Sequence, residues 1–267
     1  MALSVGLIGC GSIGAAVLAA LDGGAIGDVA CDAILVRQPR EAGSVDRRLT
    51  TDIAPFLDAG PNLVVDCAGQ AALREHGAEV LSRGRDLMTV SMGAFFDDAL
   101  HRDLVRLAEA NGAKLLLLSG AVGALDLLGA AAEGGLDSVE MAIEAPWTTL
   151  HGTPAAETLD LAALTATTTV FRGTAREGAR HYPHTANIAA AVALAGLGLD
   201  ETILEVRAKP DEDGYVVTLA ATGAFGRFRL EEEMKLDPRT RTKVAPLVSW
   251  AVLKSIRQYA ATVKMGR

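Results

Sequence analysis

A glycine-rich stretch near the start of the chain has the residue types and spacing of a phosphate-binding turn. The apolar run from Leu3 to Ile8 leads into Gly9-x-Gly11-x-x-Gly14, and a run rich in Ala and Leu follows. In such a motif the first glycine permits a tight turn, the second lets backbone approach a pyrophosphate, and the third lets a helix pack closely on the strand. The opening N–H groups of that helix favour negative charge. The pattern predicts a dinucleotide site whose contacts are Gly9, Gly11, Ser12, Ile13 and Gly14.

The end of the second predicted strand bears on which dinucleotide is bound. NAD-specific sites place an Asp or Glu there, which accepts a hydrogen bond from the ribose 2′-hydroxyl. Here the strand expected at Cys31 to Val36 is followed by Arg37. An arginine can stack on adenine and pair with a 2′-phosphate. We therefore expect Arg37 to contact the cofactor and NADP to be favoured over NAD, although a solvated surface arginine is the alternative interpretation.

The first 120 residues alternate between apolar strands and helical periods, which predicts a parallel sheet covered on both faces. Residues 1–120 are therefore expected to form a doubly wound, Rossmann-type dinucleotide-binding domain. The expected strands are 3–8, 31–36, 62–66, 87–91 and 114–118, and the expected helices include 71–82 and 97–111. Ligands of such sheets bind beyond the carboxyl ends of the strands. Further cofactor contacts are expected there, at Cys67, Ala68, Gly69, Ser91, Met92 and Gly93.

Residues 121–240 have a different pattern, since period-two alternation replaces the continuous apolar runs. It predicts an α+β domain with a mostly antiparallel sheet, for substrate binding and dimerisation. The expected strands are 138–143, 167–172, 203–208, 215–221 and 225–231, with a helix over 187–195 and a hairpin turn over 211–214. Residues 241–267 are expected to contribute an amphipathic helix, 243–259, which packs back on the first domain.

Composition excludes several classes of protein. The 267 residues carry a formal net charge of −8 without a basic cluster, so we expect neither nucleic acid nor a membrane as partner. The three cysteines lack Cys-x-x-Cys spacing and are expected to be reduced and buried. No apolar run is long enough to span a bilayer. We expect a soluble, cytoplasmic protein that binds no metal.

Several motifs together resemble the L-aspartate dehydrogenase family, in order and over nearly the whole chain. They are GLIGCGSIG at the start, VVDCAG at 64–69, TVSMGAF at 89–95, LLSGAVGALDLL at 117–128, GGLDSV at 134–139, the segment 171–200 and TGAFGRF at 222–228. The resemblance implies reversible oxidation of L-aspartate to iminosuccinate, which hydrolyses to oxaloacetate and ammonia, with NAD or NADP. It also implies cofactor contacts at Ala121 and Asn187 and, by analogy, a homodimer through the sheet of the second domain.

The chain departs from this family where the chemistry should occur. Family members carry an acid/base histidine on the strand before the Gly-x-Phe-Gly turn, and the corresponding residue here is Val217. The family's Lys-Asn-x-Asn appears as His184-Thr185-Ala186-Asn187, and a further lysine corresponds to Ala145. Valine can neither donate nor accept a proton. The mechanism that the resemblance implies cannot therefore run unaltered.

His184 is the best remaining acid/base candidate, because it lies three residues before Asn187 and titrates near neutral pH. Thr185 and His151 are candidate substrate contacts, although Thr185 is also a candidate helix N-cap. The sequence thus predicts an NAD(P)-dependent oxidoreductase of aspartate dehydrogenase type, acting on a CH–NH2 group. Two alternatives are a divergent imine reductase or amine dehydrogenase with another small substrate, and a catalytically silent NADP(H)-binding protein.

Overall fold

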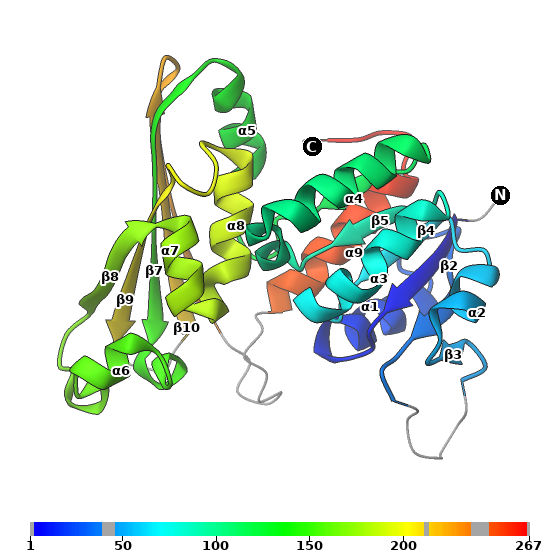
Figure 1. Cartoon of the computed structure of the whole chain (residues 1–267), viewed down its shortest axis with the longest axis horizontal. Helices are drawn as coiled ribbons and strands as arrows, with labels where there is room; N and C mark the ends of the chain where they lie inside the picture. Colours follow the sequence, from blue (N-terminus) through cyan, green and yellow to red (C-terminus); the bar gives the residue numbers. More distant parts are fainter. Residues whose placement is uncertain (1–2, 39–45, 211–213, 236–245, 266–267) are drawn as a thin grey trace. The chain divides into compact units, whose positions relative to one another are not determined.

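The chain forms two compact units, Met1–Gly120 with Pro246–Arg267, and Ala121–Ala245 (Figure 1). We call them unit 1 and unit 2. This computed structural model describes residues 3–38, 46–210, 214–235 and 246–265, and it leaves the side chain of His184 undescribed.

Unit 1 contains a six-stranded parallel sheet in the order β3-β2-β1-β4-β5-β6, which confirms the predicted doubly wound fold. Its strands are β1 (Leu3–Ile8), β2 (Val29–Leu35), β3 (Leu49–Thr50), β4 (Leu63–Asp66), β5 (Asp86–Thr89) and β6 (Leu115–Leu117). The two-residue β3 was not expected, since so short a strand has no periodicity to detect. The strand order reverses between β1 and β4, and a dinucleotide binds at such a switch point.

Helices cover both faces of this sheet. They are α1 (Ser12–Asp22), α2 (Ile53–Asp58), α3 (Gln70–Ser82), α4 (Asp98–Ala110) and α9 (Pro246–Ala260), with the 3-10 helix η1 (Met92–Phe96). On one face α1 packs against α9, and Val17 and Val252 share a fully buried core with Val5 of β1. On the other face Gly77 of α3 lies against Leu104 of α4. No helix in the described part of the chain is long and apolar enough to cross a membrane.

The carboxyl-terminal helix α9 belongs to the core of unit 1. Val252 and Ile256 are fully buried in it. Beyond them, the Tyr259 hydroxyl donates a 2.7 Å hydrogen bond to Asp86 Oδ2, and Arg257 donates a 3.1 Å bond to the Ala25 carbonyl. These apolar and polar contacts join α9 to segments that precede it by more than 150 positions in the sequence.

Unit 2 contains a five-stranded sheet in the order β11-β10-β7-β9-β8. The strands are β7 (Leu136–Pro146), β8 (Thr168–Thr174), β9 (Ile203–Lys209), β10 (Gly214–Gly223) and β11 (Gly226–Lys235). The sheet is mostly antiparallel as predicted, since only the pair β7–β9 is parallel. The predicted hairpin over 211–214 is wrong, because β9 and β10 lie on either side of β7; residues 211–213 themselves lie outside the described part.

One face of this sheet, the inner face, is covered by helices (Figure 1). The helical segments of unit 2 are α5 (Leu125–Glu133), η2 (Trp147–Leu150), α6 (Pro154–Thr158), η3 (Leu161–Ala163), α7 (Ala175–His181), η4 (Pro183–Thr185) and α8 (Ala186–Ala195). Gly178 of α7 lies against Leu204 of β9, and Gly196 after α8 lies against Val139 of β7. Alternation in the strands therefore places apolar side chains inward.

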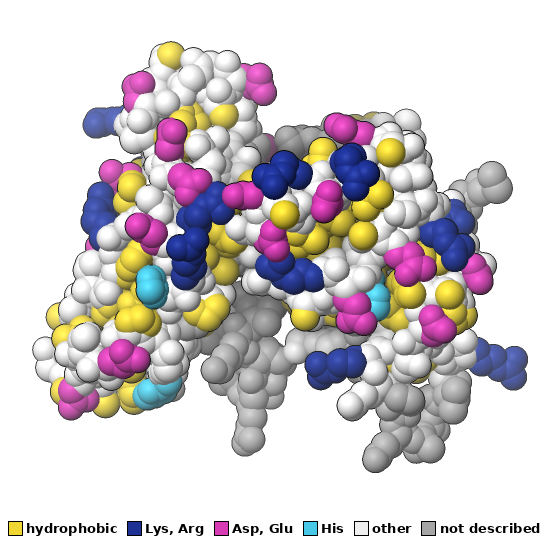
Figure 2. Space-filling model, viewed as in Figure 1, with side chains coloured by type: hydrophobic (Ala, Val, Ile, Leu, Met, Phe, Trp, Pro, Cys, Tyr) yellow, Lys and Arg dark blue, Asp and Glu magenta, His cyan; other side chains and the backbone are white. Residues whose placement is uncertain are grey.

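The outer face of the same sheet carries ion pairs. Arg207 contacts Glu205 at 2.8 Å and Glu144 at 3.0 Å, and Arg172 contacts Glu205 at 3.3 Å and Glu140 at 3.1 Å. Figure 2 shows a similar mixture of acidic and basic side chains over the face of the molecule in view.

The best-connected carboxylate of this network is Glu205, which also accepts a 2.6 Å hydrogen bond from the Thr169 hydroxyl. The hydrogen bonds from Arg207 and Thr169 lower the pKa of Glu205 from 4.5 to about 2. Because the pKa of Glu205 is lower in the folded protein than in the unfolded chain, the ionised carboxylate stabilises the fold at pH values above about 4.5. This contribution to the free energy of unfolding is lost as the pH falls from about 4.5 to about 2.

We therefore expect Glu205→Gln to lower the free energy of unfolding at pH 7 by about 1.5–3 kcal/mol, the range for hydrogen bonds to charged groups. Urea titrations at pH 7 and pH 3 measure this difference, which should shrink at the lower pH. An equal loss at both pH values would contradict the assigned role of its charge. Glu231, exposed on β11, provides the matched control Glu231→Gln.

Candidate functional site

The turn between β1 and α1 is built on close backbone approaches that only glycine permits. Gly9 has φ +89°, and a Cβ there would collide with Ala68 in the turn after β4. A Cβ at Gly14 would collide with the Gly9 carbonyl. Both glycines are therefore required by packing, and together they bring β1, α1 and the β4 turn into contact.

Gly11 has a different environment. A Cβ at this position would meet no atom within 4 Å, and the φ of −77° is open to any residue. The protein itself therefore gives no packing reason for glycine here. The open space fits the approach of a phosphate group, which is the part that the second glycine of such a motif serves.

The first turn of α1 presents backbone donors next to this open space. The first helical hydrogen bond runs from Ala15 N–H to the Gly11 carbonyl at 2.8 Å, so the N–H groups of Ser12, Ile13 and Gly14 have no partner within the helix. No side chain in the described part of the chain caps this turn. Three N–H groups at a positive helix end can hold a pyrophosphate, so the observed turn fits a dinucleotide.

A buried carboxylate connects the turns after β4 and β5. Asp66 is fully buried and accepts hydrogen bonds from the Thr89 hydroxyl at 2.7 Å, the Ser91 hydroxyl at 2.6 Å and the Ala68 N–H at 3.0 Å. Gly69 N–H donates a fourth. Burial raises the pKa of Asp66, and these four donors offset part of the rise because they stabilise the carboxylate.

This network was not predicted as such. Thr89 was missed entirely, although a buried Asp at the end of an apolar strand is a visible signal that polar partners must exist. Ser91 was predicted to contact cofactor, whereas its side chain is 1% exposed and donates to Asp66. The side chains of Cys67 and Met92 are also buried, so their backbone is the part that a ligand can approach. Burial raises the pKa of the Cys67 thiol, which therefore stays protonated.

The other predicted contacts of unit 1 lie at the same edge of the sheet. Arg37 is exposed two residues after β2 ends. Gly69, with φ +109°, forms the N-cap of α3, and Gly93 lies within η1. All of these residues follow the carboxyl ends of parallel strands.

The predicted residues of unit 2 lie in three separate segments. Asn187 is exposed in the first turn of α8, and Ala121 is buried in the turn that follows β6. His151 is exposed after η2, with its ring edge-on to Trp147 at 5.3 Å between centroids. His184 lies in η4, but its side chain is outside the described atoms, so its predicted acid/base role stays a prediction.

Thr185 precedes α8 at the N-cap position, yet its side chain does not cap the helix. It is 2% exposed, and its hydroxyl donates a 2.8 Å hydrogen bond to the Tyr182 carbonyl. A hydroxyl has one proton to donate. In this conformation Thr185 therefore holds the turn before α8 and has no proton left for a substrate carboxylate.

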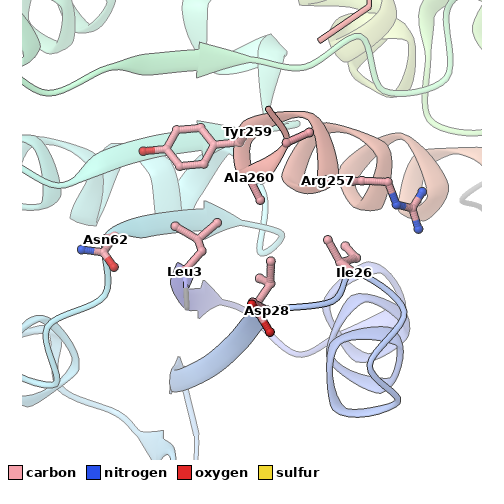
Figure 3. Close-up of a pocket in the computed structure, with 9 residues that line it drawn as sticks. Leu3, Ile26, Asp28, Asn62, Arg257, Tyr259 and Ala260 are labelled. Carbon is pink, nitrogen blue, oxygen red and sulfur yellow. The ribbon is translucent and has the colours of Figure 1, made fainter. Parts of the chain in front are cut away.

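A cavity of about 580 Å³ lies at the opposite edge of the parallel sheet (Figure 3). It is lined by the first residues of β1 and β2, by Asn62 before β4 and by the end of α9 with Arg257 and Tyr259. Dinucleotides bind at the carboxyl ends of such strands, whereas this cavity is at their amino ends. It is therefore distinct from the nucleotide site. Among the described residues no three His, Cys, Asp or Glu side chains gather as metal ligands would.

Two known protein families match successive parts of the chain. Residues 9–118 match the homoserine dehydrogenase NAD-binding domain, and residues 126–259 match the aspartate dehydrogenase C-terminal domain. L-aspartate dehydrogenase of Cupriavidus taiwanensis is 39% identical over 98% of this chain and 100% of its own length. L-aspartate dehydrogenase of Ruegeria pomeroyi is 40% identical over 97% of this chain and 94% of its own. The chain belongs to the L-aspartate dehydrogenase family.

Solved structures agree on the fold of this family member. The crystal structure of aspartate dehydrogenase from Thermotoga maritima covers 99% of both chains with a TM-score of 0.77 at 21% identity. An archaeal homoserine dehydrogenase in complex with NADPH covers 100% of both chains with a TM-score of 0.63 at 12% identity. The family membership confirms the resemblance, and the NAD(P)-binding domain is shown by the match over 9–118.

Alanine substitutions at Gly11 and Gly14 should have different effects, the first on NADPH binding and the second on the stability of the fold. Gly11→Ala should leave the melting temperature unchanged but weaken NADPH binding by about tenfold or more, or about 1.4 kcal/mol, because its methyl group occupies the space for phosphate. Gly14→Ala should lower the free energy of unfolding by about 1–3 kcal/mol, because the added methyl overpacks α1 against β1.

Thermal unfolding and fluorescence titration with NADPH measure both effects. A Gly11→Ala variant that binds NADPH as tightly as the parent protein would show that phosphate does not approach this turn.

Proposed function

We propose that the protein catalyses the reversible, NAD(P)-dependent oxidation of L-aspartate to iminosuccinate. The observation that carries this proposal is the match to L-aspartate dehydrogenases along the full chain, at 39% and 40% identity. The β1–α1 turn supports it, because its shape and its three donors fit a dinucleotide pyrophosphate. When bound, the nicotinamide accepts or supplies the hydride.

The protein residues would contribute binding, orientation and proton transfer. In the oxidative direction the substrate ammonium loses a proton, and C2 then gives up hydride as its carbon–nitrogen bond becomes a double bond. Water converts the imine to oxaloacetate and ammonia. A positioned acid/base group accelerates such proton transfers by about 10²–10⁴-fold.

The test is turnover of oxaloacetate plus ammonia by the purified protein, followed as NADPH or NADH oxidation, beside a panel of monocarboxylic oxo acids and preformed imines. We expect oxaloacetate with ammonia to be the preferred pair. Turnover of other imines alone would instead favour the imine reductase or amine dehydrogenase alternative. Cofactor binding without turnover across the panel would favour the catalytically silent alternative.

For the cofactor we propose that NADP is accepted at least as well as NAD. Arg37 supports this, since it is exposed just past β2, where the ribose of a bound dinucleotide lies, and no acidic residue directly follows it. A homodimer through the sheet of unit 2 also stays a proposal, which sedimentation analysis would test.

Arg37→Ala should weaken NADPH binding by about tenfold, the equivalent of about 1.4 kcal/mol, and leave NADH binding within about twofold. The difference is expected because only NADPH carries the 2′-phosphate. Arg83→Ala serves as control, since Arg83 follows α3 and pairs with Asp58 at 3.3 Å. Equal weakening of both cofactors in Arg37→Ala would exclude a phosphate contact.

A further inference from the structure

The inner face of the unit 2 sheet contains one carboxylate in an otherwise apolar row. Register places Glu232 of β11 opposite Val217 of β10, Val217 opposite Ile143 of β7, and Ile143 beside Val206 of β9. Val217, Ile143 and Val206 are at most 1% exposed. Among the described residues paired on this face in β7, β9, β10 and β11, Glu232 alone has an acidic or basic side chain.

Only one of the two carboxylate oxygens of Glu232 is hydrogen-bonded among the described residues. The Gly123 N–H donates a hydrogen bond to Glu232, and a Cβ at Gly123 would collide with Oε1. The second oxygen, Oε2, is buried and has no hydrogen-bond partner among the described residues. An unpaired buried carboxylate oxygen destabilises a protein. A glutamine would accept the same bond from Gly123 and would bury no charge, so packing alone does not explain the acid.

The segment that Glu232 contacts points to the purpose of the acid. Gly123 follows the last residue of β6, Leu117, by six positions. This connection leaves the carboxyl end of a parallel strand, the edge at which such sheets bind ligands. It also contains Ala121, which was predicted to contact the cofactor.

We propose that Glu232 is the acid/base group of this enzyme, where it takes the proton from the substrate ammonium before hydride transfer and returns one in reductive amination. The role rests on the proposed aspartate oxidation. In the oxidative direction an N–H bond of the substrate breaks and an O–H bond forms at Glu232. The nitrogen lone pair freed in this way allows the carbon–nitrogen double bond to form as C2 loses its hydride, which a bound nicotinamide would accept. Val217, the position of the family histidine, is the direct cross-strand neighbour.

The surroundings suit this chemistry. Burial raises the pKa of Glu232, and the Gly123 hydrogen bond offsets only part of the rise. The net shift is toward neutral pH, where an acid/base group works best. The other titratable side chain described on this part of the face is Tyr215, two positions from Val217 and hydrogen-bonded to Thr149. Helix α8, over the same face, contains no charged residue.

Glu232→Gln tests the proposal, with Glu233→Gln as its matched control, because Glu233 is exposed on the outer face of the same strand. We expect Glu232→Gln to lower kcat for aspartate oxidation by about 10²-fold or more, as loss of an acid/base group does. NADPH affinity and melting temperature should not fall, and Glu233→Gln should match the parent protein. Val217→His added to Glu232→Gln should recover at least a tenth of the parent rate, because it places an imidazole on the same face.

The outcomes separate this proposal from the proposed function. A parent protein that does not turn over aspartate, or oxaloacetate with ammonia, contradicts both. Parent turnover with full activity retained in Glu232→Gln contradicts the Glu232 role alone. If the glutamine variant fails to fold, Glu232→Met gives the same test: its side chain has similar length and suits the apolar row, and activity retained in it would equally overturn the role.

Discussion

The nucleotide site depends on one buried carboxylate. Asp66 ends β4 and holds, through its hydrogen bonds, the backbone of its own turn, the side chain of Thr89 at the end of β5 and the side chain of Ser91 two residues later. Ala68 in that turn is the surface against which Gly9 packs, and Gly9 in turn sets the depth to which α1 approaches β1 at Gly14. Because each approach is limited by backbone contact, the free N–H groups of α1 are held in one position. Such preorganised donors bind a pyrophosphate without first having to rearrange.

The sheet of unit 2 also places one carboxylate, that of Glu232, on an otherwise apolar face. This sheet separates charge by face: Arg–Glu pairs form the outer face, and apolar side chains under α5, α7 and α8 form the inner one. Against that background the inward-facing Glu232 conflicts with the local pattern, and such conflicts concentrate at functional sites. Val217 stands where the family carries a histidine, and the neighbouring Glu232 carries a carboxyl, which like an imidazole can take up and release a proton.

The sequence predicted the parts of this protein that have a period or a motif. Continuous apolar runs gave β1, β4, β5 and β6 within a few residues, and alternation gave the mostly antiparallel second sheet. Pairing between distant strands could not be predicted in the same way. We expected β9 and β10 to pair directly as a hairpin, whereas β7 lies between them. Glu232 was missed for the same reason, because its position depends on the pairing of β11 with β10. The predicted strand stopped at Glu231, and three consecutive glutamates resemble a solvated edge until the register with β10 shows that the middle one faces inward. Thr89 was hidden likewise, since only pairing between β4 and β5 brings it to Asp66.

In the proposed reaction, hydride passes between the nicotinamide and C2 of an aspartate-derived imine. The most direct measurement supplies oxaloacetate, ¹⁵N-ammonium and NADPH carrying deuterium at the transferred C4 position, and analyses the product by NMR. We expect aspartate with deuterium at C2 and ¹⁵N at the amine. Deuterated malate would show that the protein reduces a ketone rather than an imine, and deuterium retained entirely on the cofactor would contradict hydride transfer to this substrate.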